Sequence, residues 1–178
     1  GGNLYFLSAR FTEVDLPSLR SVDGYAYFRY VYADTVSMPA LTTIGSYIKL
    51  DRCRPRYSSD GSSLDIDKLE SVGSSFRLEY SDLSSVNASA LQTVGSEFSM
   101  TEIEGGLTTL SFESLEFVRG YFEITDCDSL TVAYFNSLAS IGFTRWSPSS
   151  TPTRAPSVHT SEDENQNYGG YNYNNYNY

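Results

Sequence analysis

The chain has 178 residues, a formal net charge of −10 at pH 7 and a pI near 4.4. This length allows one domain with a sizeable core, while the acidic balance argues against nucleic acid as a partner, because neutralising phosphates requires a basic face. No apolar run approaches the roughly 20 residues that cross a bilayer, so we expect no membrane insertion.

One element recurs without gaps through the first 146 residues: Leu-x-x-(Val/Ile), then a glycine, then alternating apolar residues. The leucines that begin its copies stand 22, 28, 22, 24 and 23 residues apart: Leu19, Leu41, Leu69, Leu91, Leu115 and Leu138. A repeat of this length is typical of solenoids, in which each copy forms one stacked unit.

Each copy contains an alternating segment that begins just after the glycine. In the first copy Ala26 and Phe28 alternate with Tyr25 and Tyr27, and this period of two predicts a half-buried strand. The glycine before it supplies a backbone that can turn sharply. A second, weaker strand is expected before each leucine and after the fifth copy, at residues 14–16, 36–38, 64–66, 86–88, 110–112 and 130–132.

A single period of two short strands and two corners cannot bury its own apolar side. Stacking the copies about 4.8 Å apart buries these sides and pairs the backbones in parallel ladders. The sequence therefore predicts an all-β, parallel β-solenoid of about six short coils, in which Phe76, Phe98 and Phe122 are successive neighbours in one interior. The alternative is a β-sandwich whose strands share a pattern by coincidence.

Two copies carry a resemblance to a known family: Leu41-Thr-Thr-Ile-Gly-Ser-Tyr-Ile-Lys-Leu50 and Leu69-Glu-Ser-Val-Gly-Ser-Ser-Phe-Arg-Leu78. They resemble the receptor L-domain repeat, which is related to leucine-rich repeats, and the resemblance covers roughly residues 10–143. The family implies an extracellular β-solenoid that binds proteins or supports a wall or surface layer. The chain lacks the cysteine-rich modules of the receptor members, and a shared fold does not by itself establish function.

The first coils carry outward tyrosines at Tyr25, Tyr27 and Tyr47. Such rings can stack as a ladder that stabilises the sheet. They can also form an exposed patch that contacts a protein or a sugar.

The two cysteines occupy the same column, three coils apart, in oppositely charged surroundings: Arg52-Cys53-Arg54 and Asp126-Cys127-Asp128. A separation of roughly 14 Å at that coil spacing disfavours an internal disulfide, which needs Cα atoms within about 7 Å. One hypothesis is a contact between Cys53 of one copy and Cys127 of another, guided by the flanking charges. The alternatives are two free thiols in turns, or an internal bridge in a different coil geometry.

Other chemistry is sparse in the sequence. Asn87 begins an N-glycosylation sequon, and it should point outward because Val86 and Ala88 point inward. His159 is the only histidine and lies among Pro and Ser residues, so catalysis by a positioned imidazole is not expected. We expect no cofactor and no metal, although carboxylate pairs such as Asp126 and Asp128 would also suit a polysaccharide-cleaving site.

The composition changes after Trp146, which divides the chain into a solenoid at 1–146, a Ser/Thr/Pro-rich acidic linker at 147–164 and a Tyr/Asn-rich tail at 165–178. Tyr/Asn alternation is too polar to fold alone, yet it can stack rings and form amide ladders once paired. The candidate contact residues in the tail are Tyr171, Tyr173, Tyr176 and Tyr178. The alternative is a solvated, disordered tail.

These observations predict a non-enzymatic, extracellular structural protein, secreted or at the cell surface. We expect other copies of the chain as its main partner, joined into a filament or surface layer through the solenoid ends and the tail. The alternative is an adhesion or ligand-binding domain that recognises glycans or another surface protein.

Overall fold

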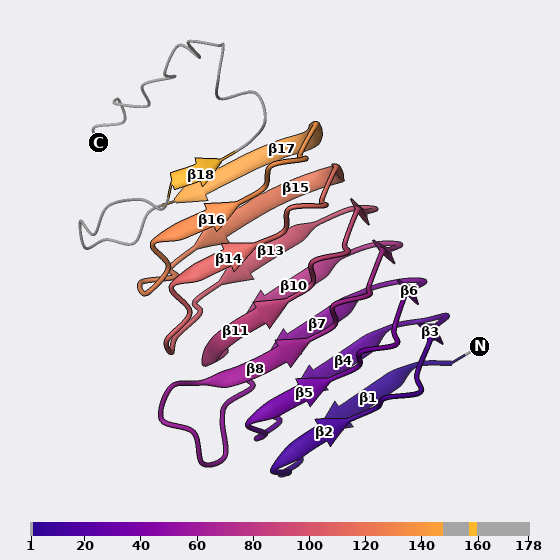
Figure 1. The fold of residues 1–178 in the computed structure, drawn as a ribbon, viewed down its shortest axis with the longest axis vertical. Coiled ribbons are helices and arrows are strands. Elements are labelled where there is room, and N and C mark those ends of the chain that lie inside the picture. The colour runs from indigo at the N-terminus through magenta and orange to yellow at the C-terminus, as the bar shows by residue number, and fades with distance from the viewer. Residues whose placement is uncertain (1, 148–156, 160–178) are drawn as a thin grey trace, which may run out of the picture.

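The computed structural model describes residues 2–147 and 157–159. The chain winds as an all-β parallel solenoid of about six turns, and these residues contain no helix (Figure 1). Successive turns stack along one axis, so strands far apart in the sequence lie side by side. This arrangement confirms the fold class predicted from the repeat.

The strands form two parallel sheets. The 11-stranded sheet holds β1 (Leu4–Leu7), β4 (Ala26–Arg29), β7 (Ile48–Asp51), β10 (Phe76–Glu79), β13 (Phe98–Thr101), β15 (Phe117–Thr125), β17 (Ser140–Ser147), β3 (Ser21–Val22), β6 (Thr43–Ile44), β9 (Ser71–Val72) and β12 (Thr93–Val94). The seven-stranded sheet holds β2 (Glu13–Asp15), β5 (Thr35–Ser37), β8 (Ser62–Asp65), β11 (Leu83–Asn87), β14 (Thr109–Ser111), β16 (Val132–Tyr134) and β18 (Ser157–His159).

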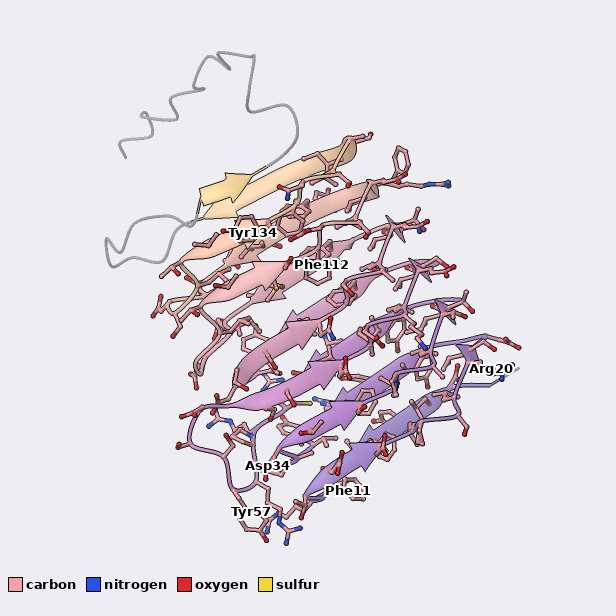
Figure 2. All side chains as sticks on the ribbon, in the orientation of Figure 1. Phe11, Arg20, Asp34, Tyr57, Phe112 and Tyr134 are labelled. Carbon is pink, nitrogen blue, oxygen red and sulfur yellow. The ribbon has the colours of Figure 1, made fainter. Side chains whose placement is uncertain are left out.

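The register of the sheets follows the predicted columns of the repeat. Phe76 pairs with Phe98, and Phe98 pairs with Phe122. Their rings stack in the interior with centroids 5.3 and 5.0 Å apart. In a second aromatic column Phe112, labelled in Figure 2, stacks on Phe135 with centroids 5.8 Å apart. The ring of Phe112 meets that of Phe98 edge-on, with planes 88° apart. One continuous apolar interior thus joins the turns, as a stack of mutually dependent units requires.

The first four copies of the repeat contain one more strand than the sequence pattern indicates, while in the fifth and sixth copies the corresponding residues belong to the long strands β15 and β17. The Val/Ile of the repeat and the residue before it form a two-residue strand, as in Thr43–Ile44, which pairs with its equivalents above and below. The prediction of two strands and two corners per turn is therefore wrong for the turns that contain β3, β6, β9 or β12, which hold three strands. A strand of two residues is too short to show a period-two pattern.

The glycine that follows this short strand has a different role from the one expected. Gly73 lacks a positive φ, but a Cβ built on it would lie 2.1 Å from the carbonyl oxygen of Gly45 in the turn below. Glycine is therefore required by the close approach of two backbones. The sharp left-handed turn lies elsewhere.

That left-handed turn follows the long strands β1, β4, β7, β10, β13 and β15, and the residue with positive φ is never glycine there. Six residues hold a φ between 51° and 56°: Ser8, Tyr30, Arg52, Tyr80, Glu102 and Asp126. We call this the αL corner. Positive φ is uncommon for such residues, so neither propensity nor the alternation predicts this conformation.

The one long step of the repeat, 28 residues, contains an extra loop that directly follows the αL corner of the third turn. Asp34 holds the loop, because one of its carboxylate oxygens accepts N–H groups from Arg56, Tyr57 and Ser58 at 2.8–3.0 Å. The loop also reaches the fifth turn, where the N–H of Gly106 donates to the carbonyl of Asp60.

At the C-terminal end, β17 extends through Ser147, one residue past the predicted solenoid boundary. Within the segment predicted to be a linker, β18 pairs in parallel with β16. The tail at 165–178 and its four candidate tyrosines lie outside the described residues.

Candidate functional site

The N-terminal end of the column exposes three strand edges. β1 and β3 are the two ends of the main path of the 11-stranded sheet, and β2 ends the other sheet. The N–H groups of Leu4 and Ser8 donate to carbonyls of the second turn. Because successive residues of a parallel strand bond to opposite sides, the N–H groups of Tyr5 and Leu7 face the open end.

Apolar side chains accompany these edges. The first turn contributes partly buried residues that pack against the core: Leu4, Phe6, Phe11, Leu16 and Leu19. Phe6 stacks on Phe28 with centroids 5.2 Å apart, so the interior column continues down to this end. A hollow of about 380 Å³ opens beside Leu4, Leu19 and Val22. The end therefore combines unpaired backbone groups with apolar surface, as an unpartnered sheet edge does.

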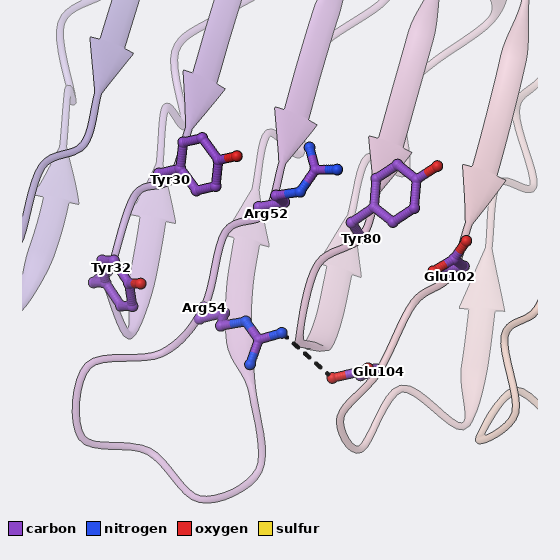
Figure 3. Close-up of a pocket in the computed structure, with 7 residues that line it drawn as sticks. All are labelled: Tyr30, Tyr32, Arg52, Arg54, Tyr80, Glu102 and Glu104. Carbon is purple, nitrogen blue, oxygen red and sulfur yellow. Dashed lines mark ion pairs between the residues drawn. The ribbon is translucent and has the colours of Figure 1, made fainter.

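A second surface runs along the side of the column at the αL corner. Its first row consists of the six residues with positive φ. Its second row consists of the residues two positions later: Arg10, Tyr32, Arg54, Asp82, Glu104 and Asp128. Figure 3 shows the central members of both rows side by side. We call them the first row and the second row.

The middle of these rows forms a groove of about 280 Å³. The guanidinium of Arg52 lies 5.7 Å from the ring centre of Tyr30 and 4.6 Å from that of Tyr80. In the second row, Arg54 faces Glu104 at 3.9 Å, with both side chains more than half exposed. An exposed pair of this kind contributes little stability, so both charges are available to other partners.

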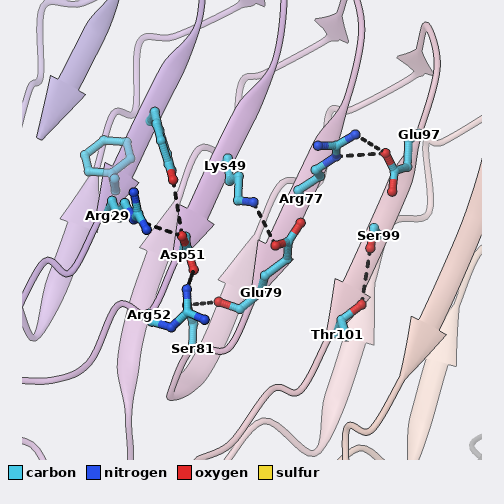
Figure 4. A network of polar contacts seen from close by, with 12 residues as sticks. Arg29, Lys49, Asp51, Arg52, Arg77, Glu79, Ser81, Glu97, Ser99 and Thr101 are labelled. Atoms are coloured by element: carbon cyan, nitrogen blue, oxygen red, sulfur yellow. Dashed lines mark hydrogen bonds and ion pairs between the residues drawn. The ribbon is translucent and has the colours of Figure 1, made fainter. Parts of the chain in front are cut away.

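The predicted tyrosine patch is a ladder on the outer face of the first sheet. Tyr25 and Tyr47 stack with centroids 4.9 Å apart and planes 4° from parallel. The Tyr27 hydroxyl donates to Asp51 at 3.2 Å (Figure 4). Desolvation and the nearby Asp51 carboxylate raise the pKa of Tyr27 to about 12. All three rings are half-buried and have partners within the chain, which accounts for them structurally.

The same face balances its charges internally. Asp51 is buried and has three partners, accepting from Tyr27 and Arg52 and lying 3.3 Å from Arg29. Lys49 contacts Glu79 at 2.7 Å, and Arg77 contacts Glu97. The guanidinium of Arg52, a contact candidate, is therefore partly engaged with Asp51, while the side chain of Arg54, the second candidate, is exposed.

The structure contradicts the expectation that Cys53 lies at a contact surface. Its side chain is 2% exposed, and its thiol donates to the carbonyl of Phe28 at 3.4 Å. Burial raises the pKa of Cys53 to about 12 and that of the half-buried Cys127 to about 11. Both thiols are free. Cys53 lies between Arg52 of the first row and Arg54 of the second, and its side chain points inward. A disulfide between copies through Cys53 would therefore require the interior to open.

The remaining predicted residues lie at the surface. Asp126 and Asp128 are the last members of the first and second rows, and both are exposed. Asn87 points outward from β11, as the burial of its two neighbours predicts, and its amide donates to Asp65 at 2.8 Å.

Within residues 2–147 and 157–159, no group of three or more His, Cys, Asp and Glu side chains is placed to hold a metal ion. The same part of the chain contains no helix long and apolar enough to cross a membrane.

Sequence reasoning named the solenoid ends and four members of the rows, Arg52, Arg54, Asp126 and Asp128, but it missed the rows as continuous surfaces. The signal for the rows is present, since the residues fall at a constant distance after each long strand. This spacing does not stand out in the sequence, because the side chains at these positions change from basic and aromatic to acidic along the column.

The fold and these surfaces define a parallel β-solenoid with an open N-terminal end and a charged corner. Comparisons of the chain with protein-family models, with curated proteins and with solved structures find no match.

Proposed function

We propose that this chain is a non-enzymatic structural protein of the cell surface or extracellular space that associates with itself, end to end, into a filament or layer. The observation that carries the proposal is the open N-terminal turn, with the three edge strands β1, β2 and β3. These edges can accept a further set of parallel strands with the same cross-section, and another copy of the solenoid offers such strands.

The composition of the open turn supports stacking over solvation. Its partly buried apolar residues become fully buried when a further turn covers them, and burial of apolar surface drives association. Natural edge strands are usually protected by charge, proline or bulges. β1, with the sequence Leu-Tyr-Phe-Leu, has none of these.

The extracellular assignment rests on the resemblance of the repeat to receptor L-domains and on the outward sequon at Asn87. The proposed partners are other copies of the chain, with glycans or other surface proteins as secondary contacts. The Tyr/Asn tail enters from its sequence alone, as a low-complexity connector able to pair with a sheet edge.

The substitution Leu7→Pro tests end-to-end stacking. The Leu7 N–H faces the open end, so proline removes a donor that the chain itself does not use, and proline is tolerated on such an edge. We expect the full-length variant to remain folded but to lose filaments in negative-stain electron microscopy. The matched control is Leu7→Ala, which removes the exposed side chain and keeps the N–H. It should assemble as the parent does, and normal assembly of Leu7→Pro would refute stacking through β1.

Deletion of residues 165–178 tests the connector separately. We expect shorter or fewer filaments, because the end-to-end contact keeps its strand edges and loses the reinforcement of the tail. Particle lengths measured in the same images give the comparison, and unchanged lengths would remove the tail from the mechanism.

A further inference from the structure

We propose that the two rows of the αL corner form a lateral interface at which a second copy of the chain docks antiparallel, related by a two-fold axis between the third and fourth turns. The interface lies on the side of the column and is separate from its ends. It therefore does not depend on end-to-end stacking.

The first row is self-complementary under this symmetry. An axis between the third and fourth turns brings the first turn of one copy to the sixth of the other, the second to the fifth and the third to the fourth. The pairs are Ser8 with Asp126, Tyr30 with Glu102, and Arg52 with Tyr80. Two of these join a hydroxyl to a carboxylate, and the third joins a guanidinium to an aromatic ring.

The second row is complementary under the same operation. Its pairs are Arg10 with Asp128, Tyr32 with Glu104, and Arg54 with Asp82. Two of these are ion pairs and one joins a hydroxyl to a carboxylate. No pair in either row brings together two like charges, and moving the axis by half a turn, onto the fourth turn, would oppose Asp82 with itself. That register would also pair Arg52 with Glu102 and Arg54 with Glu104, so it is the absence of any like-charge contact that favours the axis between the turns.

Several charged side chains of the rows have no oppositely charged partner within the described part of one copy, although Arg10 lies 5.3 Å from the ring centre of Tyr32. Among the residues that the structure describes, Arg10, Glu102, Asp126 and Asp128 form no ion pair. This contrasts with the adjoining sheet face, where Asp51, Lys49 and Arg77 all have oppositely charged partners. A surface that leaves basic residues at one end and acidic residues at the other suits an inverted copy of itself.

The inserted loop leaves the rows accessible except at Asp82, which is half-buried beside Gly61 of the loop. Figure 3 shows it leaving Arg54 away from the rows, and hydrogen bonds to Asp34 and Gly106 keep it in place. Tyr30 and Tyr80 remain 36% and 38% exposed. Glu102 and Glu104 line the same groove as Arg52 and Arg54. This mixture of charges favours a second copy of the chain over an anionic polymer as the partner.

The expected dimer is weak and sensitive to salt. Two rows over six turns make a strip about 25 Å long at the solenoid spacing. A strip only two side chains wide buries less area than the roughly 800 Å² per partner of stable interfaces. Ion pairs at such an exposed surface are screened at high ionic strength. Weak lateral contacts of this kind gain strength when end-to-end association repeats them along a column.

A charge swap tests the register. Arg10 and Asp128 are five turns apart in one chain, so they can meet only between copies. Sedimentation equilibrium of the full chain carrying Leu7→Pro, at about 50 mM and about 500 mM NaCl, measures lateral association apart from end stacking. We expect Arg10→Asp and Asp128→Arg each to weaken the dimer at least about tenfold at low salt, because symmetry places the substituted pair at two points.

The double variant Arg10→Asp/Asp128→Arg should restore dimerisation to within about threefold of the parent at low salt. Its control is Arg10→Asp/Glu116→Arg, which has the same net charge but places the new arginine at an exposed site outside the rows; this variant should remain weakened. If both double variants recovered dimerisation, the effect would depend on net charge alone and the proposal would be overturned. A parent chain that stays monomeric at low salt would also overturn it, while an effect of Leu7→Pro on filaments bears on end stacking only.

Discussion

Two corners of each turn show opposite solutions to bending a chain in a stacked column. The glycine corner has ordinary backbone angles but no room for a Cβ, as at Gly73. The αL corner has room for tyrosine and arginine side chains but requires a positive φ. One corner is constrained by the backbone of the next turn, the other by its own dihedral angles.

The number of residues in each turn is constant at the glycine corner and varies after the αL corner. Four residues separate the Val/Ile from the first inward residue of the long strand in each of the first five copies of the repeat. The distance from the αL residue to the next leucine varies, at 11, 11, 17, 11, 13 and 12 residues from Ser8 to Asp126. Insertions are tolerated where the chain projects into solvent, so variation in length collects beyond the αL corner.

The largest effect is expected from Gly73→Ala. A Cβ at this position would lie 2.1 Å from the carbonyl oxygen of Gly45, and a rigid backbone cannot give way as a side chain can. We expect a loss of about 3 kcal/mol in the free energy of unfolding, measured by urea denaturation. Gly2→Ala is the matched control, since nothing lies within 4 Å of its Cβ, and equal losses in the two variants would contradict a requirement set by close approach.

A smaller effect is expected at the αL corner, from two substitutions of Glu102. Its φ is 51°, a conformation that asparagine tolerates well and a β-branched residue tolerates poorly. Glu102→Asn should stabilise the fold by about 0.5 kcal/mol, and Glu102→Val should destabilise it by about 1 kcal/mol. Both remove the same charge, so the difference between their urea midpoints isolates the backbone. Equal midpoints would show that this corner is not strained.

The sequence predicted the solenoid because apolar alternation in the long strands is directly visible, and the column from Ala26 through Ile48 to Phe76 lies in the predicted register. It did not predict the short strands, since two residues carry no periodicity. The burial of Cys53 also escaped it, because the αL residue before it shifts which side chains point inward. That a solenoid has ends follows from the repeat, but the antiparallel complementarity of the rows depends on which turns become neighbours, so it appears only once the coils are assembled.

The third prediction concerns the loop inserted after the αL corner, where only local order should change. Backbone N–H groups of Tyr57 and Ser58, with that of Arg56, lower the pKa of Asp34. The ionised carboxylate is therefore the form that holds the loop. Anchoring should be complete above the ordinary aspartate pKa of about 4 and be lost as pH falls through the lower folded value. The amide resonances of these three residues, followed by NMR between about pH 6 and pH 2, should report the change.

At neutral pH the same anchor can be removed by Asp34→Ala. Arg54 precedes Pro55 and so resists trypsin, which leaves Arg56 as the cleavable residue of the loop. We expect trypsin to cut the variant at this bond at least about tenfold faster, because cleavage of a native loop follows its local opening. Asp60→Ala is the control, since that side chain contacts only its neighbour Ser59. Cleavage should stay at the parental rate there, while equal acceleration in both variants would show that Asp34 does not hold the loop.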